Sequence, residues 1–253
     1  MNMIHAKTGN TRNSLRQHPE LLEHITDLNR VILDAIVQEQ HYNSGSIMFK
    51  QGEPANFLHI IVKGVVLVYM QSNGSSHTRS RAQDAEQAPT QLVSFLKPGE
   101  LLGEIAFIDN SERSATAEAI HDTVTLAMSK EHFKTIRANF PALAFELVVV
   151  ELAKRVRTGN VHAQVLMKRK PLSRLARFLH DMAQHHGISV DGEDLVDLYV
   201  SQSRLERLLG FANTSVSKIM VGLKDEGVIE SRPKNRVRIC DMPRLEEMAN
   251  GDE

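Results

Sequence analysis

The sequence predicts an α+β fold in which a roll of short strands, a long helix and a smaller helical unit with a β-hairpin follow one another. Short apolar runs separated by turn residues fill residues 42–128. Helical spacing continues over about 141–167, and two short helical patterns and a hairpin follow from residue 201. A chain of 253 residues is long enough for two such domains.

The composition excludes several classes of protein. Hydrophobic residues make up 42% and charged residues 24%, as in a globular chain rather than a disordered or fibrous one. No uninterrupted aliphatic run is longer than Leu147–Val150, which is too short to span a membrane, and residues 1–30 hold no core of signal-peptide length. The single cysteine, Cys240, excludes an intrachain disulfide and a four-cysteine cluster. We therefore expect a cytoplasmic protein.

The N-terminal part changes from a helical to a strand pattern at Tyr42. We expect a loose tail over 1–18 and a helix over 19–40, where Leu21, Leu22, Ile25, Leu28, Ile32, Leu33 and Ile36 share one stripe. Strand-like runs follow at 47–49, 57–62, 65–69, 92–96 and 123–128, with turn residues between them. They predict a β-roll within a domain over 19–140. The polar segment 71–91 predicts an exposed inserted loop.

A long helix is predicted next, with Pro141 in its first turn. Its apolar residues are spaced 3, 4, 3, 4 and 3: Val149, Leu152, Val156, Gly159, Ala163 and Leu166. This heptad-like seam favours a dimer contact, although packing on its own domain would use the same pattern. Residues 168–171 break the helix at a proline, so we place the dimerisation helix and hinge at 141–170 and the second domain at 171–253.

One constellation in the roll has the chemistry of an anion site. Residues 98–107 bring a turn at Gly103 together with the carboxylate of Glu104, and Arg113 follows after a short gap. A guanidinium fork and bare backbone amides suit a phosphate, and a carboxylate suits a sugar hydroxyl. By composition alone, a structural ion pair between Glu104 and Arg113 is an equal alternative.

The run Gly-Glu-Ile-Ala-Phe at 103–107, with Arg-Ser-Ala-Thr at 113–116, resembles the phosphate-binding cassette of cyclic-nucleotide-binding domains. This resemblance implies that Glu104 binds the ribose 2′-hydroxyl and that Arg113 binds the cyclic phosphate. Gly103, Ile105 and Ser114 would lie beside them. It also implies a cyclic nucleotide as allosteric effector, with cyclic AMP first and cyclic GMP second, and no metal.

The segment 201–223 has the pattern of a helix-turn-helix. Ser201 is a good N-cap, and Gly210 supplies a turn between the apolar sets Leu205, Leu208, Leu209 and Val216, Ile219, Met220, Leu223. An ordinary helical hairpin is the alternative. The second helix exposes polar side chains able to reach base edges or phosphates: Asn213, Thr214, Ser217 and Lys218. A β-hairpin with its turn at 233–235 is predicted next, and it would form the wing of a winged helix.

The segment that contains the predicted helix-turn-helix and wing has a positive net charge. The whole chain carries −1, but residues 201–240 hold eight Lys/Arg and four Asp/Glu, a difference of +4. Such a local excess is the electrostatic footprint of a DNA-binding module.

The two modules in this order, with a dimer-type helix between them, resemble the Crp-Fnr family of bacterial transcription regulators over residues 19–245. The resemblance implies a cyclic-nucleotide-responsive, sequence-specific regulator rather than an enzyme. As a homodimer it would bind an inverted-repeat operator in double-stranded DNA and act with RNA polymerase. The recognition helix would be 212–223, with Asn213, Thr214 and Lys218 reading bases and Ser201, Gln202 and Ser215 on phosphates.

The chain departs from the cyclic-AMP receptor branch of that family. The branch has Arg-Glu where this chain has Asn213-Thr214, which leaves the operator sequence open. It has Thr-Ser on the long helix where this chain has Gly159-Asn160, which leaves open the base of the cyclic nucleotide that is bound. We hypothesise that Asn160 reaches the base. A cyclic dinucleotide, or activity without ligand, stays an alternative. One cysteine and twelve scattered histidines give little support to a haem or redox sensor. The sequence also shows no nucleophile–base set, which argues against an enzyme.

Overall fold

A computed structural model describes residues 15, 20, 21, 23, 25–71, 90–150, 152, 153, 156, 170–190, 192–211 and 216–251. The chain forms two compact units, one made of residues 1–71 with 93–158 and the other of 72–92 with 159–253. The expected α+β class, with a roll of strands before a helical unit, is confirmed.

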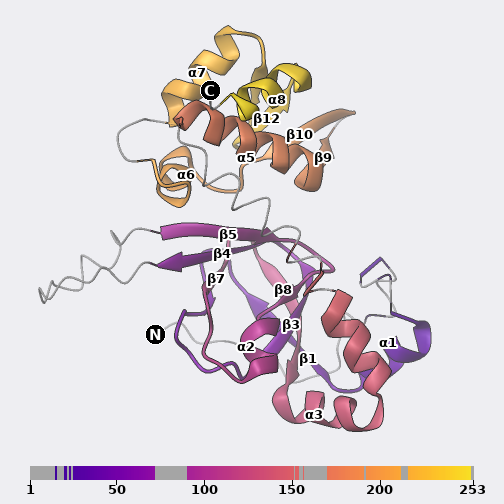
Figure 1. The fold of residues 1–253 in the computed structure, drawn as a ribbon. Coiled ribbons are helices and arrows are strands. Elements are labelled where there is room, and N and C mark those ends of the chain that lie inside the picture. Colours follow the sequence, from indigo (N-terminus) through magenta and orange to yellow (C-terminus); the bar gives the residue numbers. More distant parts are fainter. Residues whose placement is uncertain are drawn as a thin grey trace, which may run out of the picture. The chain divides into compact units, whose positions relative to one another are not determined.

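The described part of the first unit is a roll of two four-stranded sheets, in the orders β1-β8-β3-β6 and β2-β7-β4-β5 (Figure 1). A further helix covers residues 141–150. The labelled elements are α1 (Asp27–Asp34), β1 (Val37–Tyr42), β2 (Ile47–Phe49), β3 (Phe57–Lys63), β4 (Val66–Gln71), β5 (Thr90–Leu96), β6 (Leu101–Leu102), α2 (Glu104–Asp109), β7 (Thr116–Ala119), β8 (Thr123–Ser129) and α3 (Lys130–Asn139).

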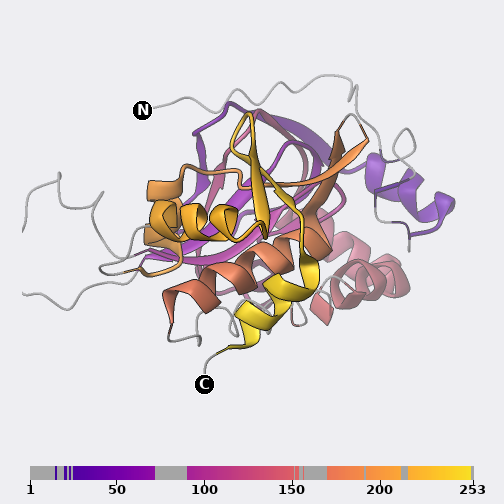
Figure 2. The same ribbon diagram turned by 90° about the horizontal axis from the view of Figure 1, so that it is seen from above.

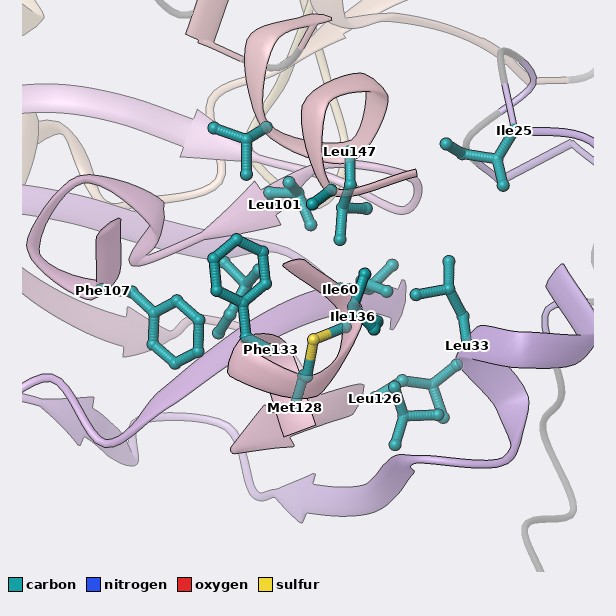
Figure 3. Packing of buried hydrophobic residues seen from close by; sticks show 14 of the residues in the cluster. Ile25, Leu33, Ile60, Leu101, Phe107, Leu126, Met128, Phe133, Ile136 and Leu147 are labelled. Carbon is teal, nitrogen blue, oxygen red and sulfur yellow. The ribbon is translucent and has the colours of Figure 1, made fainter. Parts of the chain in front are cut away.

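Strand β3 is apolar along nearly its whole length because both of its faces are covered. Successive strand residues point to opposite faces. Leu58 and Ile60 join the core beneath α1, α3 and helix 141–150, whereas Ile61 joins the core between the two sheets. In the first core, Phe107 and Phe133 meet edge to face with ring centroids 5.3 Å apart (Figure 3).

The helix expected over 19–40 is wrong at both ends. The described residues before Thr26, the N-cap of α1, form turns and a bend. Helix α1 ends at Asp34, and residues 37–42 form β1, which pairs antiparallel with β8. The backbone groups of β1 are satisfied by that long-range pairing, which a local helical pattern does not register. The apolar stripe before α1 is nevertheless a burial signal, because Leu21 and Ile25 lie in the first core.

The short strands agree with the turn-punctuated pattern of the sequence. Strand β2 covers the predicted 47–49, and β3, β4, β5 and β8 lie where strands were expected. Gln71 ends β4 and Thr90 begins β5, and the remainder of the expected inserted loop, 72–89, lies outside the described residues.

The second unit holds α5 (Pro171–His186), β9 (Gly187–Val190), β10 (Glu193–Asp197), α6 (Gln202–Leu208), α7 (Val216–Asp225), β11 (Ile229–Arg232), β12 (Arg236–Ile239) and α8 (Met242–Asn250). Its described strands form one sheet in the order β11-β12-β10-β9. Helices α5 and α8 pack side by side (Figures 1 and 2). At one end of this pair, Ser173 Oγ donates to the carbonyl of Gly251 at 3.3 Å.

Beyond α5, β9 and β10 form a hairpin that the sequence pattern does not predict. In β9 the half-buried Ile188 and Val190 alternate with the exposed Gly187 and Ser189, but four residues are too few for this alternation to mark a strand in the sequence. The predicted wing is confirmed as the β11–β12 hairpin. At its turn Lys234 and Asn235 have φ values of 61° and 60°, and the Asn235 side chain donates to the carbonyl of Val200.

We predict that Gly64→Ala destabilises the roll more than Gly45→Ala does. Both glycines have positive φ, +94° and +82°, so each alanine is strained by about 1–2 kcal/mol. At Gly64 the added Cβ would also lie 2.7 Å from the carbonyl oxygen of Asp122, whereas at Gly45 it meets nothing within 4 Å. Urea unfolding followed by circular dichroism should give Gly64→Ala at least about 1 kcal/mol the larger loss. Equal losses would contradict the packing explanation.

Candidate functional site

The backbone of Arg113 is clamped by the loop that connects β2 to β3. The Arg113 N–H donates to the carbonyl of Glu53 at 2.8 Å, and its carbonyl accepts from the Gly52 N–H at 2.8 Å. The loop is itself closed, because the Lys50 N–H donates to Oε2 of Glu53 at 3.0 Å. The turn residues expected at 52–54 therefore fix the position from which the arginine side chain starts.

The Arg113 side chain is only 4% exposed and runs into the roll. Its Nη1 donates to the carbonyl of Gly103 at 2.7 Å and its Nη2 to the carbonyl of Phe57 at 2.6 Å. The guanidinium carbon lies 3.9 Å from the centre of the Phe49 ring, a cation–π distance. The buried Nε has no hydrogen-bond partner among the described residues. The Nε–H of the buried cation thus remains open.

Gly103 is required at its position for two reasons. Its φ is +85°, in the region that glycine adopts without strain, and it precedes α2 with no side-chain cap. A Cβ added there would overlap the Arg113 guanidinium, at 2.9 Å from Cζ. The glycine therefore allows the arginine to approach the turn before α2.

The charges in this region are those of Arg113 and its acidic neighbours. Burial lowers the pKa of Arg113 to about 10, while the nearby carboxylates of Glu104 and Glu53 act in the opposite direction. The guanidinium is therefore cationic at neutral pH. Glu104, the first residue of α2, is 2% exposed, so its carboxylate lies inside the protein beside this cation.

His59 lies deeper in the same region and does not add a charge. It is 3% exposed, and its Nδ1 is 3.3 Å from Oγ1 of Thr125. Burial and the nearby Arg113 lower the pKa of His59 to about 3, so the ring is neutral at physiological pH. Three aromatic rings surround it at centroid distances of 6.3 or 6.4 Å: Tyr42, Phe49 and Phe57.

A pocket opens beside the arginine, with an empty volume of about 310 Å³ including the open space at its mouth. It is lined by Phe49, Val68, residues 102–106 and residues 113–115. The pocket brings together Gly103, Glu104, Ile105, Arg113 and Ser114, the ligand residues that the sequence predicts within the roll. Ile105 is 45% exposed there. The other two predicted ligand residues, Gly159 and Asn160, lie outside the described part of the chain.

Sequence reasoning missed Phe49 and the carbonyl of Phe57. Phe49 reads as an ordinary core residue of a strand, and no sequence signal marks a backbone carbonyl 56 positions away as a partner of Arg113. A buried arginine needs acceptors on several sides, which is the only general reason to look for such partners.

In the second unit, side chains from two helices fix the turn between α6 and α7. Arg174 of α5 donates through Nη1 to the carbonyls of Leu209 and Gly210, each at 3.0 Å. Oε1 of Glu206 accepts from the Val216 N–H at 2.7 Å, which caps the start of the described α7. The rotation of α7 about its axis is further set by its buried residues, Val216, Met220 and Leu223.

The opposite face of α7 is exposed and carries Ser217 and Lys218, as the sequence predicts. Ser201 is exposed at the start of α6, where its Oγ accepts from the Arg204 N–H at 3.3 Å, and Gln202 is half-buried beside it. The remaining predicted DNA residues, Asn213, Thr214 and Ser215, lie outside the described residues.

The local charge of +4 overstated the positive field around the wing. Arg232 pairs with Glu193 and with Glu230 at 2.8 Å each, and Arg236 pairs with Asp197 at 3.3 Å. Glu193 and Asp197 belong to β10, outside the window that was counted. By contrast, Lys218 forms no ion pair with any described residue, so its charge is available on the exposed face of α7.

Comparisons with known proteins agree with both halves of this architecture. The cyclic nucleotide-binding domain family matches residues 39–140, and the Crp-like helix-turn-helix domain family matches residues 173–248. The "Cyclic AMP receptor protein" of Thermus thermophilus is 27% identical over 215 residues, covering 85% of this chain and 89% of that protein.

A further relative and a solved structure are similar to most of this chain. The "CRP-like cAMP-activated global transcriptional regulator" of Mycobacterium tuberculosis is 26% identical, over 83% of this chain and 87% of that one. The structure of FixK2 from Bradyrhizobium japonicum superposes with a TM-score of 0.67 at 20% identity, covering 84% of this chain and 97% of that one. This last likeness shows the fold.

The cyclic nucleotide-binding domain and the helix-turn-helix domain define a cyclic-nucleotide-binding transcription regulator that binds DNA. The chain belongs to the Crp-Fnr family, whose members are transcription regulators rather than enzymes. In the part of the chain that the structure describes, no helix is long and apolar enough to cross a membrane, and no cluster of three or more metal-ligating side chains is found.

We predict that Glu206→Ala weakens the second unit through the start of α7. The Val216 N–H would lose its acceptor, a loss of about 0.5–2 kcal/mol for a helix cap. Glu206→Gln keeps a side-chain oxygen at the same place and should lose much less. Urea unfolding should show this order, and hydrogen exchange of residues 216–225 should be faster in the alanine variant alone. Equal behaviour of the two variants would argue against the capping role.

Proposed function

We propose that this regulator is a homodimer that binds cyclic AMP in the roll and, when it has done so, binds an inverted-repeat operator. The observation that carries the proposal is the buried Arg113 guanidinium at the pocket, with an open Nε and Glu104 beside it. It acts in the cytoplasm, where DNA and RNA polymerase are found in bacteria.

Arg113 supplies the charge that a cyclic phosphate would meet. Its cation is largely shielded from water, so an anion in the pocket would interact with it more strongly than at the surface. The open Nε can donate to a phosphate oxygen, and Glu104 can accept from a ribose hydroxyl. Ser114 is exposed at the pocket and offers a further hydroxyl donor.

Cyclic AMP is favoured over other ligands by the names of the relatives. The relatives from Thermus thermophilus and Mycobacterium tuberculosis bear names that refer to cyclic AMP. That Asn160 distinguishes adenine from guanine stays a prediction, as do the hinge at 168–171 and the domain boundaries drawn from the sequence.

An exposed apolar stripe on the helix from residue 141 supports the homodimer. Phe145, Val149 and Val156 are 64%, 40% and 63% exposed, and their spacing of four and seven places them on one face. A second copy related by a twofold axis would cover this stripe in both protomers. Leu152 packs on the core of its own unit, and Gly159, Ala163 and Leu166 of the expected seam lie outside the described residues. Phe145 was not part of the seam predicted from the sequence.

A symmetric dimer would present two copies of α7 to successive major grooves. The exposed Ser217 and Lys218 would face the base edges, and Ser201 at the start of α6 would meet a phosphate. Ligand binding would favour the arrangement in which both α7 helices fit one operator, a population shift between two states of the dimer. Recruitment of RNA polymerase follows from the family.

Arg113→Leu should weaken cyclic AMP binding by at least about tenfold, because charge-assisted hydrogen bonds to phosphate contribute roughly 1.5–3 kcal/mol each. Arg137→Leu, which removes an exposed arginine from α3, is the matched control and should bind as the wild type does. Calorimetry with cyclic AMP, cyclic GMP and a cyclic dinucleotide measures both variants, with circular dichroism to confirm folding. Unchanged affinity of a folded Arg113→Leu protein would refute the phosphate role.

If Lys218 reads a guanine, Lys218→Ala should relax the preference at one base pair per half-site by roughly 1–3 kcal/mol. If it holds only a phosphate, the variant should bind all sequences more weakly and with a shallower salt dependence. We expect base reading. Selection from random DNA with cyclic AMP present decides between the two roles, with Lys224→Ala as a control on the same helix. Recovery of single, unpaired half-sites by the wild type would defeat the dimer.

A further inference from the structure

An exposed aliphatic side chain stands in the middle of the polar face of α7. Val221 is 51% exposed. Its neighbours three and four positions away, which share its side of the helix, are all polar and exposed: Ser217, Lys218, Lys224 and Asp225. A single exposed valine is ordinary on a protein surface, so its exposure alone does not indicate a function. Its position beside Lys218 is the feature that indicates one.

The packing of α7 places Val221 on the centre line of this face. At about 100° per residue, Val221 lies about 40° from Ser217 and about 60° from Lys218 around the helix axis, but about 160° from Leu223. Leu223 and Met220 are each 1% exposed and fix which side of α7 faces the core. The Glu206 cap fixes where the described helix begins. Val221 therefore cannot turn inward without unpacking the helix.

A valine in the major groove can read only one feature of a base pair. Its side chain has no donor or acceptor, so it carries no hydrogen-bond information. The C5-methyl group of thymine is the apolar group that unmodified bases display in that groove. The branched Val221 side chain is also stiff about χ1, so little freedom is lost when it is held against a methyl group.

We propose that Val221 contacts the C5-methyl group of a thymine and sets a preference for T·A at one base pair of each half-site. The inference rests on the proposed function, since it requires α7 to enter the major groove. Lys218, which forms no ion pair with any described residue, lies one turn earlier on the same face, and its positive charge favours DNA over an apolar protein surface as the occupant.

The test removes the methyl group from the DNA and the side chain from the protein. The operator is first selected from random DNA by the wild type with cyclic AMP present. Each selected thymine is then replaced in turn by deoxyuracil, which keeps the hydrogen-bonding edge and lacks only the methyl group. At one position per half-site the wild type should lose about fourfold in affinity, the factor expected for one buried methyl group. Val221→Ala should bind both DNAs equally there.

Two controls separate the contact from a general effect on the helix. Lys224→Ala, an exposed change on the next turn, should keep the thymine-to-uracil difference in full. A C·G pair placed at the same position also lacks the methyl group. Replacing its cytosine by 5-methylcytosine should restore part of the affinity for the wild type and none for Val221→Ala. Circular dichroism confirms that each variant is folded.

The outcomes distinguish this inference from the function on which it rests. If the wild type selects an operator but shows no loss with uracil at any position, or if Val221→Ala keeps the loss, the thymine contact is wrong and DNA recognition stands. If Val221→Ala changes the oligomeric state instead, the residue is a protein contact and the inference is likewise overturned. If the wild type selects no sequence at all, both the inference and the proposed function are wrong.

Discussion

The roll depends on how one buried cation is satisfied. A guanidinium removed from water is unfavourable unless its donors find acceptors, and Arg113 finds two backbone carbonyls, those of Gly103 and Phe57. These contacts join the turn before α2 to the start of β3, and the Gly52 and Glu53 backbone joins the loop before β3 to the segment before β7. The walls of the pocket are therefore positioned by the residue that supplies its charge. The positive φ of Gly103 follows from the same requirement, because any side chain there would meet the guanidinium.

The second unit uses the same device where regular hydrogen bonding ends. Arg174 takes the carbonyls at the end of α6, Glu206 takes the first described N–H of α7, and Asn235 binds the carbonyl of Val200. Each is a side chain that pairs with backbone groups that helix or strand geometry leaves unpaired. Arg174 and Glu206 position the two ends of the connection to α7, and the buried Val216, Met220 and Leu223 set its rotation. Which side chains of α7 face outward follows from these polar contacts and from that packing.

The same fold recurs in FixK2 at only 20% identity. A fold by itself does not determine a ligand. In this chain the ligand chemistry depends on a small set of side chains around Arg113, and the DNA preference depends on the outward face of α7. The neutral His59 illustrates the division: it is buried beside the cation and contributes packing to the site rather than charge. The wing residues Arg232 and Arg236 likewise serve the fold, since they form ion pairs with Glu193 and Asp197 of β10.

The sequence by itself determined the features that are local in the chain. The strands and turns of the roll, the Gly103–Glu104 turn with Arg113 nearby, and the helix-turn-helix with its wing follow from short-range patterns, because turn residues, caps and apolar periodicity act within a few positions. Only the tertiary structure decided what depends on distant partners. Residues 37–40 became a strand by pairing with β8, β9 and β10 became a hairpin, and the Arg113 side chain found a carbonyl 56 residues away. The exposure of Val221 and the neutralised wing arginines belong to this second group. Burial and charge pairing depend on which segments meet in space, and no window along the chain contains that information.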